Sequence, residues 1–174
     1  MKSHRGFSMI EVLITLVLVS IGVLGMVALQ TRTLQNTQDS VQRNAAASLA
    51  NDLLELMRAQ PAGLPATSNF YKAAASNFPA VPSAGCAATP LAPAQQLACW
   101  GEKAKLLLPG VTNELLTSDF YVCRTTQPGT CTPSAGSAVE IQIAWTVKAG
   151  ECMDSTNVNN STSTKCYYRL RAEL

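Results

Sequence analysis

The chain has 174 residues, with 13 Lys or Arg, 11 Asp or Glu and a single His. Its formal net charge of +2 gives no electrostatic reason to expect a nucleic-acid-binding protein, whose binding surface carries a clear excess of positive charge. The first 29 residues are mostly apolar. The roughly 145 residues that remain match the size of one ordinary domain with one core.

An apolar run from Phe7 to Leu29 contains one charged residue, Glu11. As a helix this run is roughly 34 Å long at 1.5 Å per residue, enough to cross the hydrocarbon layer of a membrane. A carboxylate inside hydrocarbon costs a few kcal/mol, so an ionisable residue at this depth is a candidate functional residue. The sequence therefore predicts a membrane helix in which Glu11 needs a partner.

The residues before this run, 1–6, form a short basic segment that includes Lys2 and Arg5. Positive charge favours the cytoplasmic side for this end of a membrane helix. A removable secretory signal also begins in this way, but its apolar core has about 7–15 residues and ends at a small-x-small cleavage site. The run here is longer and contains an acid, so an ordinary removable signal fits poorly.

The order of these features resembles the class III signal of the type IV pilin family: a basic leader that ends in Gly6, then Phe7, then Glu11 within an apolar helix. The resemblance implies that residues 1–6 are a leader peptide, that a prepilin peptidase cleaves between Gly6 and Phe7, and that the new amino terminus is methylated. It also implies that residues 7–30 form a transmembrane helix that later enters the filament core. Glu11 would then meet the positive amino terminus of a neighbouring subunit during assembly.

Two glycines, Gly22 and Gly25, interrupt the membrane half of the helix. Each weakens a helix interior by about 1 kcal/mol relative to Ala, so the helix is expected to bend or unwind there. The other interpretation is a seam of small residues at which membrane helices pack closely. Both interpretations can hold.

Residues 31–60 continue the helix with one apolar face, which is expected to pack on a globular domain. The residues of this face recur at helical spacing: Leu34, Val41, Ala45, Leu49, Leu53 and Leu56. Pro61 and Gly63 predict the end of the helix. The segment from Ala45 to Pro61, together with residues 22–25 and 28–30, further resembles the minor pilins known as type IV pilus modification proteins, the PilV group.

The segment 61–110 is rich in Pro and Ala and, as far as Ala98, contains a single charge, Lys72. Its prolines argue against a long helix or a central strand, so a connector loop is expected. Four aromatic residues in it are expected to fill the core: Phe70, Tyr71, Phe78 and Trp100.

Three β-prone segments follow, at 120–124, 139–148 and 166–174. The second alternates strictly between apolar and other residues, which predicts a strand that is buried on one face and exposed on the other. Residues 111–174 are therefore expected to form an antiparallel sheet that packs on the helix stripe, giving an α+β fold. The resemblance implies the same architecture, the type IV pilin fold, with a long N-terminal α-helix packed on a C-terminal antiparallel β-sheet.

Six cysteines follow the membrane segment, and their number is even. For a domain that faces the bacterial periplasm, three disulfides are the default expectation. Six cysteines allow 15 pairings, and sequence alone does not choose among them. The working prediction is sequential pairing, which closes short loops: Cys86 with Cys99, Cys123 with Cys131, and Cys152 with Cys166.

The sequence shows no features of an enzyme site. Its only histidine, His4, lies in the leader, and there is neither a phosphate-binding glycine loop nor zinc-site spacing. Neither catalysis nor a cofactor or metal is expected.

Basic and aromatic residues interleave near the end of the chain, at Lys165, Tyr167, Tyr168, Arg169 and Arg171. Strand alternation puts most of them on an ordinary solvated face, so binding of nucleic acid is not favoured.

The resemblance implies a minor pilin that takes part in the initiation, assembly or modification of type IV pili and supports adhesion and twitching motility. Its partners would be other minor pilins, the major pilin, the prepilin peptidase, the inner-membrane assembly platform and a tip adhesin. It would cross the bacterial inner membrane once, with its C-terminal domain in the periplasm, before it enters the pilus. Two alternatives stay open: a binding module at the pilus tip for adhesion or DNA uptake, and a type II secretion pseudopilin.

Overall fold

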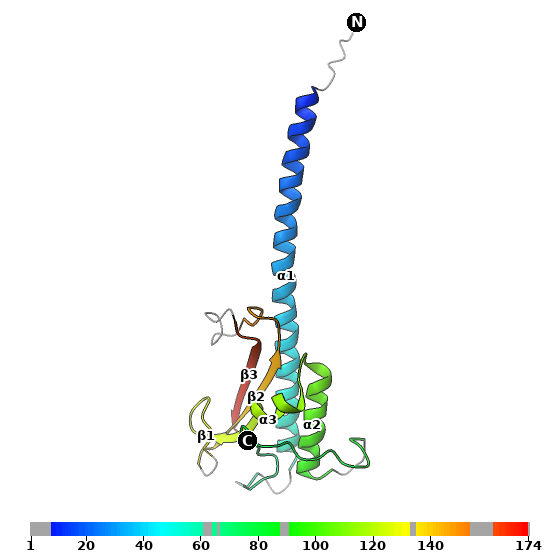
Figure 1. Cartoon of the computed structure of the whole chain (residues 1–174). Coiled ribbons are helices and arrows are strands. Elements are labelled where there is room, and N and C mark those ends of the chain that lie inside the picture. Colours follow the sequence, from blue (N-terminus) through cyan, green and yellow to red (C-terminus); the bar gives the residue numbers. More distant parts are fainter. Residues whose placement is uncertain are drawn as a thin grey trace. The chain divides into compact units, whose positions relative to one another are not determined.

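A computed structural model of the chain describes residues 8–60, 64–65, 67–87, 91–132, 135–153 and 162–173. The chain divides into two compact units, Met1–Gln38 and Asp39–Leu174. One helix, α1 (Met9–Arg58), contributes residues to both (Figure 1).

Helix α1 is one long helix, as the sequence predicts for residues 7–60, although Phe7 lies outside the described residues. It begins at Met9 and ends at Arg58, and no proline interrupts it. After Arg58 the amides of Ala59 and Gln60 still bond to carbonyls of the last turn, at 2.9 and 3.3 Å. Pro61 and Gly63, the predicted stop, lie outside the described residues.

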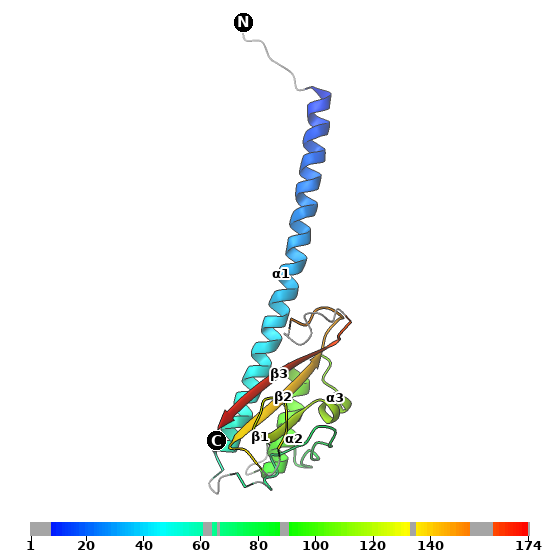
Figure 2. The same cartoon turned by 90° about the vertical axis from the view of Figure 1, so that its left-hand side faces the viewer.

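The second unit contains a three-stranded antiparallel sheet, which confirms the predicted α+β class. Its strands are β1 (Tyr121–Thr125), β2 (Ala138–Thr146) and β3 (Lys165–Glu173), in the order β1-β2-β3. Figure 2 shows β2 and β3 lying across the part of α1 that belongs to this unit.

The core of the second unit lies between α1 and the sheet. Leu49 and Leu53 of α1 and Ile141 of β2 are fully buried, and each such side chain stabilises the fold by about 1.5–3 kcal/mol. Trp145 is also fully buried and donates its indole N–H to the side chain of Gln42 on α1 at 2.8 Å. The aliphatic contacts therefore hold the sheet on the helix, and the hydrogen bond from the Trp145 indole joins β2 to α1.

The prediction of the buried apolar face of α1 is wrong at its first two residues, Leu34 and Val41. Leu34 lies in the first unit and is 64% exposed, and Val41 is 62% exposed. Residues along an α-helix are about 100° apart, so Val41 lies roughly opposite Asp39, which is buried. The buried face of α1 starts at Asp39 and continues through Ala46.

A second helix, α2 (Pro93–Leu107), replaces part of the connector loop expected at 61–110. Pro93 stands at its first position, where a proline is tolerated because the missing N–H has no partner within the helix. The backbone N–H of Ala92 donates to the side chain of Gln95 at 3.0 Å and so closes the first turn. Trp100 then packs into the core and donates to the carbonyl of Leu49 at 2.8 Å.

Two of the four aromatic residues of the connector, Phe70 and Trp100, are buried in the core as predicted, whereas Tyr71 and Phe78 are partly buried and pack against it. Phe70 is fully buried, and Phe78 stacks on Trp100 with ring centroids 6.3 Å apart. Trp100 meets Phe120 edge to face at 6.0 Å. A short helix, α3 (Asn113–Ser118), leads into this cluster just before β1.

The sulfur atoms are joined as sequential pairing predicts. The three disulfides link Cys86 to Cys99, Cys123 to Cys131, and Cys152 to Cys166. The paired cysteines are 13, 8 and 14 positions apart in the sequence, and closing a loop of that size stabilises a fold by roughly 2–3 kcal/mol.

Candidate functional site

The apolar side chains of the first unit are exposed to solvent. From Met9 to Leu29 the large apolar residues are 47–85% exposed. These 21 residues rise about 31 Å as a helix, which matches a hydrocarbon layer. Within the described part of the chain, α1 is the one helix long and apolar enough to cross a membrane, and its most apolar stretch is not buried inside the protein.

Hydroxyl groups in this stretch are satisfied within the helix. Thr15 donates to the carbonyl of Val12 at 2.8 Å, and Ser20 donates to the carbonyl of Leu16 at 2.7 Å. Such back-bonding leaves no hydroxyl hydrogen to be satisfied by water. The surface that this helix offers to its surroundings is therefore apolar apart from Glu11.

Glu11 lies in the first turn of α1, and its backbone N–H bonds to the carbonyl of Ser8 at 3.0 Å. The ion pairs among the described residues all lie in the second unit and do not include it. Gly6 and Phe7 lie outside the described residues, so the cleavage and methylation sites stay predictions.

The helix runs without a break through Gly22 and Gly25. A Cβ atom added at either position would have no heavy atom within 4 Å. The helix is therefore not unwound at these glycines, and their flexibility stays a prediction. The open space beside them would equally accept the close approach of another helix.

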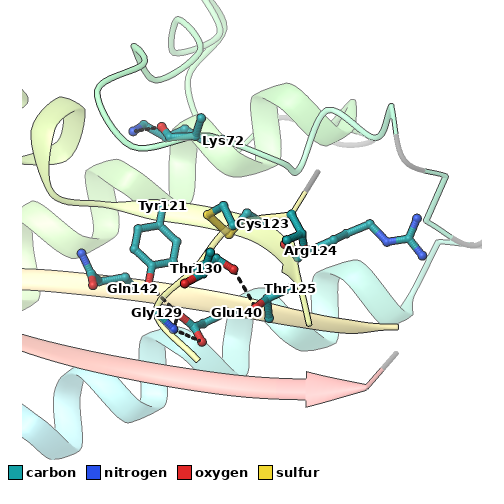
Figure 3. The surroundings of a disulfide bond; sticks show 12 residues. Lys72, Tyr121, Cys123, Arg124, Thr125, Gly129, Thr130, Glu140 and Gln142 are labelled. Atoms are coloured by element: carbon teal, nitrogen blue, oxygen red, sulfur yellow. Dashed lines mark hydrogen bonds between the residues drawn. A yellow bond between two sulfur atoms is a disulfide. The ribbon is translucent and has the colours of Figure 1, made fainter. Parts of the chain in front are cut away.

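A buried carboxylate lies on the sheet face that points away from α1. Glu140 of β2 is only 2% exposed, although alternation predicts a wet position for it. It accepts the hydroxyl of Tyr121 at 2.5 Å and the backbone N–H of Gly129 at 2.9 Å (Figure 3). Gly129 belongs to the loop closed by Cys123 and Cys131, so this loop folds over β2 and covers the carboxylate.

The burial of Glu140 and Tyr121 under this loop changes the pKa of the Tyr121 phenol. Burial raises the pKa of its phenol, and the hydrogen bond to Glu140 and the negative charge of that carboxylate raise the pKa further. The phenol therefore stays protonated and donates over the physiological pH range. The alternation within β2 carries no signal for this arrangement, because the residues that cover Glu140 belong to a separate loop.

The basic residues of β3 are engaged with neighbours. Lys165 pairs with Asp119 at 2.9 Å, and Tyr167 donates to the same carboxylate at 2.9 Å. Arg169 donates to the side chain of Gln142 at 2.6 Å. These basic side chains are therefore paired within the protein, on a sheet face that is itself partly buried at Glu140 and Gln142.

Asp39 lies within 4.8 Å of the sulfur atoms of Cys152 and Cys166, a combination of atoms that resembles a metal site. Both sulfurs are bonded to each other, and Asp39 pairs with Arg43 at 2.7 Å. Sulfur in a disulfide is not a thiolate ligand, so this cluster does not offer a metal site.

Two family models match the chain. Residues 1–27 match the prokaryotic N-terminal methylation motif, and residues 28–101 match the model described as type IV pilin Tt1218. The chain belongs to the type IV pilin family. Neither a curated protein nor a solved structure matches it.

Membership of this family accounts for the exposed apolar helix. Type IV pilins are structural subunits, so the prediction that the chain is not an enzyme is confirmed. The methylation motif covers Gly6, Phe7 and Glu11, so the pilin carries the motif of a prepilin peptidase substrate. A membrane-anchored pilin that is later incorporated into pili fits both the motif and the helix.

Proposed function

We propose that this pilin is a minor subunit that acts in the initiation, assembly or modification of type IV pili and thereby supports adhesion and twitching motility. The observation that carries the proposal is the helix surface from Met9 to Leu29, apolar on all sides and exposed. A helix that is apolar all round is stable only in lipid or inside a larger assembly. Its likeness to the PilV group, through the segment from Ala45 to Pro61, supports a minor rather than a major subunit.

Processing and assembly follow from the order of residues at the amino terminus. The prepilin peptidase cuts between Gly6 and Phe7 on the cytoplasmic side of the inner membrane, and the domain after the helix lies in the periplasm. The assembly platform then moves the subunit from lipid into the filament, where it contacts other minor pilins, the major pilin and a tip adhesin. Glu11 is neutralised there by the amino terminus of a neighbouring subunit.

The substitution Glu11→Ala tests this role. Removing the carboxylate leaves the neighbour's buried ammonium without a partner, which costs about 3–5 kcal/mol. We expect normal cleavage, seen by N-terminal sequencing, together with at least a ten-fold loss of the subunit from sheared pili.

The matched control is Glu55→Ala, because the side chain of Glu55 is 71% exposed and its ion pair with Arg58 is a weak surface pair. This variant should enter pili normally. Recovery of the Glu11→Ala subunit at the wild-type level would overturn the proposed role of Glu11.

Deletion of the gene separates the proposed function from its alternatives. Loss of surface pili supports a role in assembly. Intact pili with lost adhesion or DNA uptake would indicate a binding module at the tip, and lost export of secreted proteins would indicate a type II secretion pseudopilin.

A further inference from the structure

A cavity of about 210 Å³ opens at the end of α1 in the second unit. We call it the Arg124 pocket. Its apolar wall is formed by Met57, Leu64 and Val139, and its polar wall includes Arg58, Tyr71 and Arg124.

Arg124 occupies an unusual position for a charged residue. It pairs with Val139 in the ladder between β1 and β2, so it lies on the sheet face that packs on α1. Figure 3 shows its side chain extending away from Glu140, the buried carboxylate of the opposite face. Among the described residues, no ion pair or hydrogen bond engages its guanidinium, and a partly buried charge of this kind favours a partner.

The neighbours of Arg124 strengthen the positive character of the pocket. The described residues that line it include no Asp or Glu. Arg58 pairs with Glu55, but both side chains are largely exposed and such pairs exchange partners at little cost. Burial raises the pKa of Tyr71 and the charge of Arg124 lowers it, with burial the larger effect, so the phenol stays a hydrogen-bond donor.

We propose that the Arg124 pocket receives an acidic side chain from another protein subunit, with the carboxylate on Arg124 and the methylene groups against Met57, Leu64 and Val139. A guanidinium binds a carboxylate through two parallel hydrogen bonds. The apolar wall gives an organic acid a contact that inorganic phosphate lacks. The volume is below the ~300 Å³ typical of small-molecule sites but sufficient for a glutamate side chain.

Arg and Tyr are also the residues most enriched where protein interfaces are anchored. The partner is a pilus subunit if the proposed function is right, and the inference to that extent rests on it. The pocket lies outside the membrane helix, so it would give the second unit a contact of its own in the assembly.

The test is a titration of the full chain in detergent micelles, with ring-labelled tyrosine observed by NMR. The chain has four tyrosines, and the signal of Tyr71 is assigned by its loss in Tyr71→Phe. The probes are glutamate capped at both ends and its neutral isostere, capped glutamine. Capped glutamate should shift the Tyr71 signal with a dissociation constant on the order of 1 mM, as expected for a ligand of this size, and capped glutamine should not.

Substitutions locate the binding site. Arg124→Gln should weaken the binding of capped glutamate about ten-fold or more. Arg171→Gln removes the same charge from the exposed side of β3, where Arg171 donates to the carbonyl of Thr126 at 3.2 Å, and should leave binding unchanged. If Arg124→Gln does not fold, the comparison of the two probes on the wild-type chain decides the question.

Three results would overturn the inference. Equal shifts with capped glutamine would show that the carboxylate is not recognised, and equal loss in Arg171→Gln would show general charge attraction. Tighter binding of glucuronate than of capped glutamate would assign the pocket to an acidic sugar. Because the titration needs no pilus and the Glu11→Ala chain should bind the probe normally, failure here is separate from failure of the proposed function.

Discussion

The apolar residues of α1 serve two different environments. In the first unit, Leu18 is 63% exposed and its apolar neighbours point in every direction. In the second unit, Leu53 is fully buried, and the exposed side of the helix is polar apart from Val41, with Asp52 paired to Lys103. One helix therefore carries two patterns, and the change from all-round to one-sided apolarity marks where lipid or filament gives way to the protein's own core.

The largest effect on stability is expected from a Leu→Ala substitution in the second unit, compared with the same substitution in the first unit. Leu53→Ala should destabilise the second unit by about 3 kcal/mol or more, because it removes a buried side chain and leaves a cavity. Leu18→Ala should change the stability of that unit by less than about 0.5 kcal/mol. Chemical denaturation in detergent, followed by the fluorescence of Trp100 and Trp145, measures both, since both indoles are buried in the second unit. Equal effects of the two substitutions would show that the two units do not unfold separately.

The comparison also explains what sequence patterns could predict. The apolar run, the alternation in β2 and the even number of cysteines are local signals, and the membrane helix, the sheet and the presence of disulfides follow from them. The pairing itself does not follow from the count of cysteines, and the structure is what establishes it. Alternation of apolar and polar residues in β2 predicts that the face of the strand turned away from α1 is exposed to water. The pattern describes the strand alone and carries no information about other segments that cover it. Glu140 and Gln142 are buried there, the first under the loop closed by Cys123 and Cys131.

Two other errors have equally physical reasons. The prolines of 61–110 argue against a helix, but Pro93 stands in the first turn of α2, where a proline is compatible with a helix. The apolar repeat predicts a buried position for Leu34, because the repeat already begins before Asp39, where the second unit starts. The Arg124 pocket could not be predicted, since its lining comes from α1, the loop at Tyr71 and two strands, and no spacing in the sequence links them.

A second prediction concerns the only charge in the connector as far as Ala98, Lys72. Its side chain is almost fully buried and donates to the carbonyls of Ala73, Thr117 and Phe120 at 3.1, 3.2 and 2.8 Å. Burial lowers the pKa of Lys72 from 10.5 to about 8. Between these two values the unfolded chain binds more protons than the folded chain, so stability should rise as the pH increases from about 8 to 10.5.

The expected rise is about 1–3 kcal/mol, because each unit of pKa difference corresponds to 1.36 kcal/mol and the three carbonyls favour the charged lysine. Urea denaturation between pH 7 and 10.5 measures it on the wild-type chain and on Lys72→Met. The slope assigned to Lys72 should vanish in the variant and persist in Lys148→Met, which changes a lysine of the loop after β2. A wild-type slope between pH 8 and about 9.5 that equals the slope of Lys72→Met would contradict the prediction.

The smallest effect is expected in the first unit, at Gly22 and Gly25. Replacing either by Ala should stabilise the helix by about 1 kcal/mol, because the added methyl group meets no atom within 4 Å. Amide hydrogen exchange of the residues around Leu24, measured in detergent, should slow about five-fold for each substitution. The reverse change, Ala28→Gly, is the matched control and should speed exchange by a similar factor.

The same variants distinguish the two interpretations of these glycines in the pilus. If the helix must unwind there on assembly, Gly22→Ala and Gly25→Ala should lower incorporation into sheared pili and Ala28→Gly should not. If instead another helix packs closely on the glycines, a residue larger than Ala at the same position should lower incorporation into pili further than Ala does. The larger side chain would fill the space that the other helix needs, an effect separate from stiffening the backbone. Exchange rates that stay unchanged in all three variants would show that these positions do not control the local stability of α1, and flexibility would then play no part in how the pilin leaves the membrane.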